Sequence, residues 1–263
     1  MKLLSYNIFG LKDTEKGVPD WNIRQENVSR MLNIILKDSE IKVACFQEVN
    51  LNNMDNLSNI LIDNNFVMLD KFPMKTESYN QYNIIAVRKE LINNIENVIC
   101  IPHGKDDTYV NVEKQEIDYQ MSDYRTTIFV QITIDGSKYL IGNTHTDYIS
   151  TEGKIKGVIK SLNYMDTIES DYKVLIGDMN MVTHMSEAYN ILKSNNNYIT
   201  LSRSKNFDIL DNSWHGYGLK EQVNVDFAFV EKSKYEKYEY KIIKQENMYD
   251  EGSDHRPVII TVL

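Results

Sequence analysis

The chain has few of the residues that break secondary structure or form disulfide cross-links. Its 263 residues include 4 prolines, 11 glycines and 2 cysteines, and no stretch rich in serine, glycine and proline divides it. Without such a linker, we expect one domain over residues 1–263, with a hydrophobic fraction of 42% to fill its core. Cys45 and Cys100 stand in apolar, strand-like runs, which predicts buried thiols and not a disulfide framework.

Long apolar runs and an excess of positive charge are also missing. No apolar run approaches the roughly 20 residues of a membrane span, and the start of the chain lacks the apolar core and cleavage site of a signal peptide. We therefore expect a cytoplasmic protein, with no membrane span and no obligate protein partner. The formal net charge of −9 argues against a broad basic face that grips long duplex DNA. It does not exclude a nuclease, because a divalent cation can hold phosphate in an acidic protein.

Apolar spacing predicts strands that alternate with helices, as in α/β layered domains. Helices are expected over Arg24–Leu36, Asn53–Ile62 and Ile155–Met165. Strands are expected at Lys2–Ile8, Val43–Phe46, Ile84–Val87, Ile95–Ile101, Ile128–Ile134, Tyr139–Gly142, Lys173–Ile176 and Val223–Val230. The alternation over Ile128–Ile134 predicts a half-buried strand, Asp135-Gly136 a hairpin turn, and Glu231–Lys244 a solvated edge strand.

Polar residues gather at the ends of these apolar segments. Five strings show the pattern: Ser5-Tyr6-Asn7-Ile8, Phe46-Gln47-Glu48-Val49, Asn143-Thr144-His145, Gly177-Asp178-Met179-Asn180, and Ser253-Asp254-His255 before the final apolar run. Each string alone is a weak signal, since Asn and Asp also favour turns and caps for backbone reasons. The combination favours one shared site.

The acids and amides in these strings are typical ligands of a hard cation. Glu48 and Asp254 offer carboxylates, and Asn7 offers an amide oxygen. Mg²⁺ is commonly held by one or two carboxylates plus other oxygens and waters, which leaves room for a substrate phosphate. A zinc site is the weaker interpretation, because the histidines and cysteines lack the spacing of zinc-binding motifs.

A second group of residues suits proton transfer. Asp178 and Asn180, two apart after a strand, can share one water or phosphate oxygen, or can instead form an Asx turn. His145 and His255 can serve as acids, bases or charged donors to phosphate. Asp226, a charge inside an apolar strand, needs a partner, and His255 is the expected one. The sequence does not identify a partner for His145.

Together these strings and Val225-Asp226-Phe227 resemble, in order and spacing, the endonuclease/exonuclease/phosphatase (DNase I-like) superfamily, over residues 5–260. The resemblance implies a four-layer α/β sandwich of two packed mixed sheets with helices outside. It also implies a divalent-metal site at one end of the sheets, with Mg²⁺ as the expected ion and Mn²⁺ as an alternative.

Residue roles follow from the same resemblance. Glu48 is the implied principal metal ligand, assisted by Asn7 and Asp254. Asp178 is implied to position or activate the attacking water, and Asn180 to hold water or phosphate.

The two histidines complete the implied site. His255, oriented by Asp226, and His145 would contact the scissile phosphate or move a proton. Both Asp178 and His255 remain candidates for the base.

The subfamily is less defined. Gln47-Glu48-Val49-Asn50 departs from the Gln-Glu-Thr-Lys string of exonuclease III relatives, which disfavours abasic-site repair. The Thr-His form at His145 is shared by relatives of DNase I, sphingomyelinases, deadenylases and inositol-phosphate phosphatases. Ser213-Trp214-His215-Gly216 resembles an aromatic-His-Gly string in bacterial members.

Substrate choice is expected to lie in the irregular segments His103–Tyr124 and Ser202–Gln222. Aromatic side chains there can stack on a base or pack against loop neighbours, and two cations can contact phosphate. The candidates for stacking are Trp214, Tyr217 and Tyr119, and those for phosphate are Arg125 and Lys105.

The leading hypothesis is a Mg²⁺-dependent phosphodiesterase, with nucleic acid slightly favoured as the phosphoester substrate and hydrolysis by in-line water attack. One alternative is a phosphomonoesterase acting on a small phosphorylated metabolite or lipid headgroup. A binding module that retains the fold without turnover is the non-enzymatic alternative.

Overall fold

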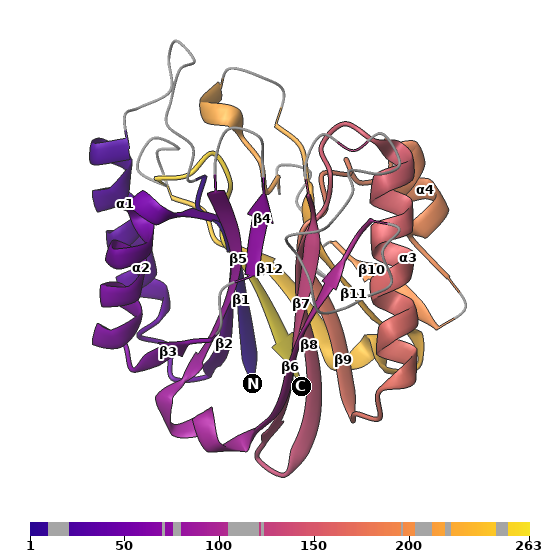
Figure 1. Cartoon of the computed structure of the whole chain (residues 1–263), viewed down its shortest axis with the longest axis horizontal. Helices are drawn as coiled ribbons and strands as arrows, with labels where there is room; N and C mark the ends of the chain where they lie inside the picture. The colour runs from indigo at the N-terminus through magenta and orange to yellow at the C-terminus, as the bar shows by residue number, and fades with distance from the viewer. Residues whose placement is uncertain are drawn as a thin grey trace.

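Two β-sheets pack face to face between two layers of helices (Figure 1). The computed structural model describes residues 1–9, 21–69, 72–75, 80–104, 121, 124–195, 197–202, 212–218, 222–245 and 252–263. The predicted four-layer α/β sandwich with mixed sheets is confirmed.

Within the described residues, one sheet has seven strands in the order β12-β13-β1-β2-β5-β3, with β4 paired to β5. Its strands are β1 (Lys2–Asn7), β2 (Ile41–Asn50), β3 (Phe66–Met68), β4 (Phe72–Lys75), β5 (Asn80–Arg88), β12 (Tyr238–Ile242) and β13 (Val258–Val262). Strands β1 and β2 are parallel, whereas the other pairs of this sheet are antiparallel.

The second sheet has six strands over the same described ranges, in the order β10-β11-β9-β8-β7-β6. They are β6 (Ile95–Pro102), β7 (Thr126–Ile134), β8 (Ser137–His145), β9 (Tyr172–Asp178), β10 (Tyr198–Leu201) and β11 (Asp226–Glu231). Its one parallel pair is β8 with β9. Each sheet therefore has a parallel pair at its centre.

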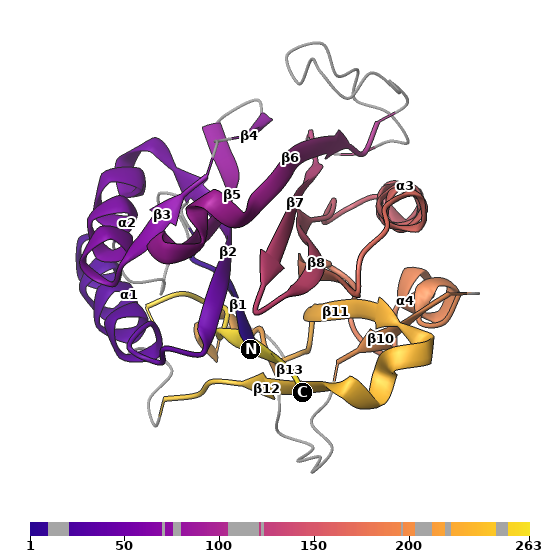
Figure 2. The ribbon, with the colours of Figure 1, turned by 90° about the horizontal axis from the view of Figure 1, so that it is seen from below.

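Helices cover the outer face of each sheet. Figure 2 shows α1 (Trp21–Ile35) and α2 (Leu51–Asp63) against the seven-stranded sheet, and α3 (Thr151–Thr167) and α4 (Glu187–Leu192) against the six-stranded one. Short 3₁₀ helices η1 (Lys89–Asn94), η3 (Gly216–Gly218) and η4 (Lys232–Lys237) connect strands. None of the helices in the described residues is long and apolar enough to cross a membrane.

Local sequence signals explain the main elements. Helix α1 buries Val28, Met31, Leu32 and Ile35, at the spacing that predicted it. The Asp135-Gly136 turn has positive φ at both residues, 50° and 81°, as a tight hairpin requires. Both cysteines are free and buried, as predicted.

Some elements differ from the prediction. Strand β11 begins at Asp226 and does not contain it in its interior. The strands predicted near Ile84 and Ile95 belong to different sheets, joined by η1. Strand β7 is buried along both faces over its first five residues and is not half-buried, because the other sheet covers one face and helices cover the other (Figure 2).

The predicted edge segment Glu231–Lys244 divides into η4 and β12. Strand β12 lies at the edge of the seven-stranded sheet, as predicted. Its residues alternate between buried Tyr238, Tyr240 and Ile242 and exposed Glu239 and Lys241. The edge is thus solvated on one face only.

A polar bridge joins the two sheets. The Gln47 side chain of β2 donates Nε2–H to Asn143 Oδ1 of β8 at 2.7 Å. Asn143 in turn donates Nδ2–H to the carbonyl oxygens of Phe46 at 2.9 Å and Ile84 at 2.8 Å. Both amide side chains are fully buried. Because hydrogen bonds between buried amides are directional, the bridge fixes how β2 and β8 align, although Gln47 Oε1 itself has no partner among the described residues.

We predict that Asn143→Ala destabilises the protein by about 3 kcal/mol. The change leaves the Phe46 and Ile84 carbonyl oxygens and the Gln47 amide without their buried partner. Urea unfolding followed by circular dichroism measures the loss. Asn163→Ala, on the exposed face of α3, is the matched control. Equal stability of the two variants would contradict a structural role for the bridge.

Candidate active site

Side chains from both sheets meet at the edge where the two parallel strand pairs end. Figure 1 shows this edge at the end of β1 opposite the chain termini. The residues brought together there are Asn7 at the end of β1, Glu48 in β2, His145 and Asp178 at the ends of β8 and β9, Asp226 at the start of β11, and Asp254 and His255 before β13.

Asp178 lies at the centre of this cluster. Its Oδ2 accepts a hydrogen bond from Asn7 Nδ2 at 3.0 Å and lies 3.4 Å from His145 Nε2 and 3.7 Å from His255 Nε2. Burial raises the pKa of Asp178, against the opposing effect of the His255 charge. A carboxylate held between two imidazoles can orient a water molecule and exchange a proton with it.

The other oxygen of Asp178 closes a turn. Oδ1 accepts a hydrogen bond from the backbone N–H of Asn180 at 2.8 Å, which is the Asx turn considered from the sequence. Asn180 has a φ of 47° and donates Nδ2–H to the Thr146 carbonyl oxygen at 3.0 Å. The turn therefore fixes Asp178 and leaves Oδ2 to face the imidazoles.

His255 and Asp226 form the predicted pair. His255 Nδ1 lies 2.8 Å from Asp226 Oδ2. Burial alone would lower the pKa of His255, but the carboxylates of Asp226, Asp178 and Asp254 outweigh it and hold the pKa well above its ordinary value. His255 therefore donates Nδ1–H to Asp226, and the surrounding carboxylates favour the protonated ring. Its Nε2 lies 3.4 Å from Asn7 Nδ2.

His145 has a partner that the sequence did not reveal. Arg125 Nη1 lies 3.1 Å from His145 Nδ1, and since a guanidinium only donates, Nδ1 must accept. The ring proton is then on Nε2, which faces Asp178 and lies 3.9 Å from Glu48 Oε1. Burial and then Arg125 lower the pKa of His145 well below its ordinary value. Arg125, predicted as a phosphate contact, thus lies behind a neutral histidine.

Glu48 reaches the cluster through an irregularity of β2. Its φ is 56°, and the register of β2 with β5 shifts between Phe46 and Val49. Such a bulge redirects a side chain at the end of a strand. Glu48 Oε1 accepts from Asn7 Nδ2 at 2.9 Å, and Oε2 accepts from Gln81 Nε2 at 3.1 Å. Burial and then the charge of Asp254 raise the pKa of Glu48.

Asp254 completes the group of acids. Trp214 donates its indole Nε1–H to Asp254 Oδ2 at 2.9 Å. The second oxygen, Oδ1, is buried without a hydrogen-bond partner among the described residues. It lies 3.9 Å from His255 Nε2.

These residues fit a hard divalent cation. The partly buried Glu48 carboxylate lies in the unfavourable field of the Asp254 charge, and Asp254 retains an oxygen with no donor among the described residues. Glu48 and Asp178 lie with His145, and Asp178 and Asp226 with His255, in groups whose possible ligand atoms are all within 4.8 Å of one another. With the ring protons as assigned above, the carboxylate oxygens are the atoms of these groups available to a cation. Buried like charges need compensation, and an oxygen-liganded cation supplies it.

Asn7 lies among the acids, but it presents nitrogen to them. Its Oδ1 accepts from the Phe9 backbone N–H at 3.0 Å, while Nδ2 faces Glu48 and Asp178. A role for the Asn7 oxygen as a metal ligand stays a prediction.

Ser253 links the Asn7 strand to the Asp254-His255 segment, a role that the sequence did not indicate. Its Oγ donates to the Asn7 carbonyl oxygen at 2.7 Å and accepts from the His255 N–H at 3.1 Å.

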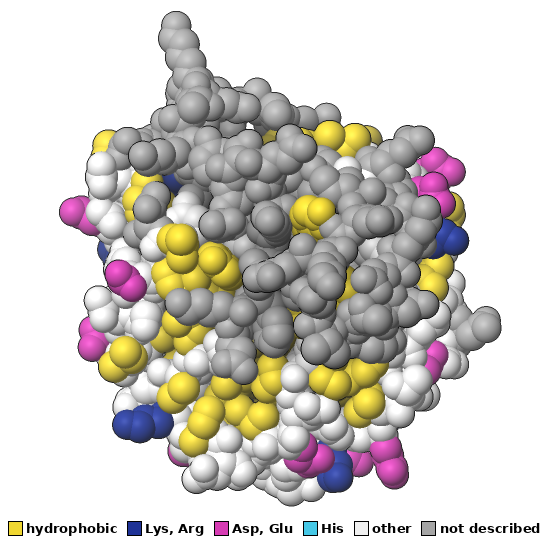
Figure 3. Space-filling model, in the orientation of Figure 1, with side chains coloured by type: hydrophobic (Ala, Val, Ile, Leu, Met, Phe, Trp, Pro, Cys, Tyr) yellow, Lys and Arg dark blue, Asp and Glu magenta, His cyan; other side chains and the backbone are white. Residues whose placement is uncertain are grey.

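The residues predicted to contact substrate have different fates in the structure. Tyr217 is 2% exposed and donates its hydroxyl to the Gly252 carbonyl oxygen at 3.0 Å, so it packs inside the loops and presents no surface for stacking. Lys105 and Tyr119 lie outside the described residues. On the face seen in Figure 3, the described Lys and Arg side chains lie singly among acidic and apolar ones.

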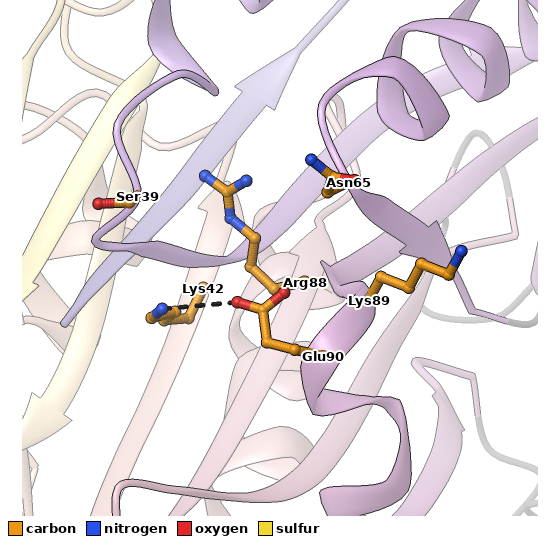
Figure 4. Close-up of a pocket in the computed structure, with 6 residues that line it drawn as sticks. All are labelled: Ser39, Lys42, Asn65, Arg88, Lys89 and Glu90. Carbon is orange, nitrogen blue, oxygen red and sulfur yellow. Dashed lines mark ion pairs between the residues drawn. The ribbon is translucent and has the colours of Figure 1, made fainter.

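A second hollow, of about 510 Å³, lies at the opposite edge of the seven-stranded sheet (Figure 4). It is lined by Ser39, Lys42, Asn65, Arg88, Lys89 and Glu90. Lys42 pairs with Glu90 at 3.7 Å. The Arg88 guanidinium donates to the carbonyl oxygens of Leu36, Asp38, Ile41 and Asn64 at 2.8 to 2.9 Å. Because its donors are bonded to backbone carbonyl oxygens, Arg88 stabilises the fold. The acid cluster is therefore the better candidate for an active site than this hollow.

Comparison with known proteins identifies the fold. No protein-family model and no curated protein sequence matches the chain. An endonuclease/exonuclease/phosphatase from Bacteroides vulgatus superposes with a TM-score of 0.78 at 18% identity, over 100% of this chain and 98% of that one. The mannosyl-6-phosphatase of Bacteroides thetaiotaomicron VPI-5482 gives 0.74 at 14% identity, over 100% and 99%. D. rerio TDP2 with a single-strand DNA product gives 0.71 at 14% identity, over 99% and 98%.

The chain therefore has the fold of the endonuclease/exonuclease/phosphatase proteins, as the resemblance of its motifs predicted. At these identities the similarity defines the fold alone. The chemistry must be argued from the residues themselves.

His103, beside the site, makes stability depend on pH. It is 1% exposed, its Nε2 lies 2.9 Å from Thr127 Oγ1, and burial lowers its pKa from 6.5 to about 3. Because the folded pKa lies below the unfolded one, the unfolded chain takes up the proton first. The stability that neutral His103 contributes is therefore complete above pH 6.5 and is lost as the pH falls toward 3.

We predict that His103→Gln makes the free energy of unfolding less sensitive to acid. Below the unfolded pKa, the wild-type protein should lose about 1.4 kcal/mol more per pH unit than the variant does. Urea unfolding at several pH values between neutrality and pH 4.5 measures the difference in slope. His184→Gln, at an exposed position, is the control and should keep the wild-type slope. A slope unchanged in His103→Gln would show that His103 takes up its proton in the folded state.

Proposed function

We propose that this protein is a divalent-metal-dependent phosphoesterase that hydrolyses a phosphodiester by in-line attack of water. The observation that supports it most is the position of Asp178 Oδ2, between His145 Nε2 at 3.4 Å and His255 Nε2 at 3.7 Å and beside Glu48. Four acids and two imidazoles from two sheets meet in one buried cluster. The fold, shared with phosphatases and nucleases, agrees with this chemistry.

Glu48 and Asp254 are the residues proposed to hold the cation, with Asn7 beside them. Two observations support this proposal. Burial and then the nearby charge of Asp254 raise the pKa of Glu48, and the buried Oδ1 of Asp254 has no hydrogen-bond donor among the described residues. Mg²⁺, or Mn²⁺ in its place, would neutralise charge on the phosphate oxygens.

The protein's own side chains supply the remaining functions. Asp178 orients the water and takes its proton, because Oδ2 is the carboxylate oxygen that faces both imidazoles. His255 is surrounded by carboxylates and backed by Asp226 at 2.8 Å, so it acts as a charged donor to phosphate. His145 adds a neutral Nε2–H donor, and Asn180 contacts water or phosphate through its amide oxygen.

Single-stranded nucleic acid is the favoured substrate class. The similar TDP2 structure holds a single-strand DNA product. The net charge of −9 disfavours long duplex DNA, since duplex binding depends on many phosphate contacts. Direct substrate contacts of Arg125 and Trp214 stay sequence-based predictions, because in the structure the Arg125 guanidinium is bonded to His145 and the Trp214 indole to Asp254. The second candidate is a phosphomonoester, because the mannosyl-6-phosphatase has a TM-score of 0.74 against 0.71 for the TDP2 structure.

We predict that Glu48→Gln, Asp178→Asn and His255→Gln each lower phosphodiester hydrolysis by roughly a thousandfold, because each removes a charged group from the reaction centre. A fluorescent single-stranded oligonucleotide, with Mg²⁺, Mn²⁺ or EDTA, reports cleavage. Asp55→Asn, exposed on α2, is the matched control and should retain full activity.

Parallel assays separate the candidate substrates. Duplex DNA, RNA, bis-p-nitrophenyl phosphate and sugar phosphates complete the panel, and release of inorganic phosphate identifies a phosphomonoesterase. EDTA should abolish turnover of any true substrate. Wild-type rates in the His255→Gln variant, or full activity in EDTA, would defeat the proposed mechanism.

A further inference from the structure

Trp214 joins the segment that leads to Asp226 to the segment that carries Asp254 and His255. It forms isolated β-bridges with Val223, three residues before Asp226, and with His255. Backbone hydrogen bonds fix the first bridge, with Trp214 N–H to the Val223 oxygen at 2.9 Å and Val223 N–H to the Trp214 oxygen at 3.0 Å. The indole is therefore anchored beside the acid cluster and has little freedom to move.

The residues that follow Trp214 fold over its ring. Gly216 has a φ of 51°, and a Cβ on it would lie only 2.9 Å from Trp214 Cζ2. A glycine is needed there for both conformation and space. This close turn delivers the backbone N–H groups of His215 and Gly216 to the Asp254 carbonyl oxygen, at 2.9 and 3.4 Å.

Asp254 is thus held at both its backbone and its side chain. The backbone oxygen accepts from His215 and Gly216, and Oδ2 accepts the indole N–H of Trp214 at 2.9 Å. An indole N–H is only a donor, so it can bind a carboxylate oxygen and cannot compete for a cation. The consequence is an asymmetric carboxylate, in which Oδ2 is occupied and the buried Oδ1 has no donor among the residues described.

We propose that Trp214 is a positioning residue that sets the rotamer of Asp254, so that Oδ1 is directed to the divalent cation. This inference rests on the proposed function, in which Asp254 is a metal ligand. It replaces the sequence-based expectation that Trp214 stacks on substrate with a role in metal affinity. Partners in the outer shell of a metal site orient the ligands and typically affect affinity by about 10- to 100-fold.

The direct test is Mn²⁺ binding to Trp214→Phe, which keeps an aromatic ring and removes the N–H. Electron paramagnetic resonance of free Mn²⁺ measures the dissociation constant without substrate. We expect it to rise about tenfold. Thermal unfolding in EDTA measures separately the cost of leaving Asp254 Oδ2 without its donor, and Mn²⁺ binding is compared at a temperature where both proteins are folded. The chain has two tryptophans, so Trp21→Phe on α1 is the matched control and should bind Mn²⁺ like the wild type.

The control variant also gives a spectroscopic readout. Trp21→Phe leaves Trp214 as the sole tryptophan, and a paramagnetic cation bound to Asp254 should quench its fluorescence. This measurement retains the native indole, so it decides the matter even if Trp214→Phe does not fold. Saturating Mn²⁺ without quenching would overturn the inference.

A double-mutant cycle separates positioning from a general packing effect. In an Asp254→Asn background, Trp214→Phe should cause no further loss of Mn²⁺ affinity, because both act through the same oxygen. Independent, additive losses would overturn the inference. If the wild type binds no Mn²⁺, the proposed function itself fails. If the wild type binds and Trp214→Phe binds equally well, only the role of Trp214 fails.

Discussion

The hydrogen bond between Gln47 and Asn143 sets the distance on which the site depends. Asn7 and Glu48 belong to one sheet, whereas His145 and Asp178 belong to the other, so no strand ladder fixes their separation. The buried amide bridge does so one residue before Glu48 and two before His145. A second inter-sheet bond, from Asn83 of β5 to the Thr126 carbonyl oxygen of β7 at 2.9 Å, supports the same alignment. Apolar packing alone tolerates sliding of one sheet over another, but directional buried hydrogen bonds do not.

That alignment concentrates negative charge. Asp178, Asp226 and Asp254 are buried in one cluster with the partly buried Glu48, and hydrogen-bond donors are directed at individual oxygens of these four acids. Asn7 serves Glu48 and Asp178, His255 serves Asp226, and Trp214 serves one oxygen of Asp254. The charge that these donors leave uncompensated is the physical reason for proposing a cation at this edge. The same acids and their hydrogen-bond donors therefore affect both the stability of the fold and the proposed chemistry.

Much of the fold followed from periodicity, because buried strands and amphipathic helices leave strong patterns. The hairpin at Asp135-Gly136, the sandwich of two mixed sheets and the pairing of Asp226 with His255 were all predicted and are all present. Short elements such as β3, β4, β10 and α4 were missed, since a few residues carry no measurable period. The Arg125 contact with His145 was missed for another reason. It lies across the predicted β7–β8 hairpin, but Arg125 is just outside the paired residues and was considered only as a phosphate contact. The bulge at Glu48 was also missed. Its positive φ is carried by a glutamate, so no glycine in the sequence indicates it.

The central claim is that the carboxylates at this sheet edge hold a divalent cation. An anomalous difference map from crystals soaked in MnCl₂ tests it most directly, because Mn²⁺ scatters anomalously and the protein ligands do not need to be assumed. We expect a single strong peak in contact with Glu48 and with Asp254 Oδ1. A fully soaked crystal with no peak at these carboxylates, or with its strongest peak elsewhere on the protein, would contradict it.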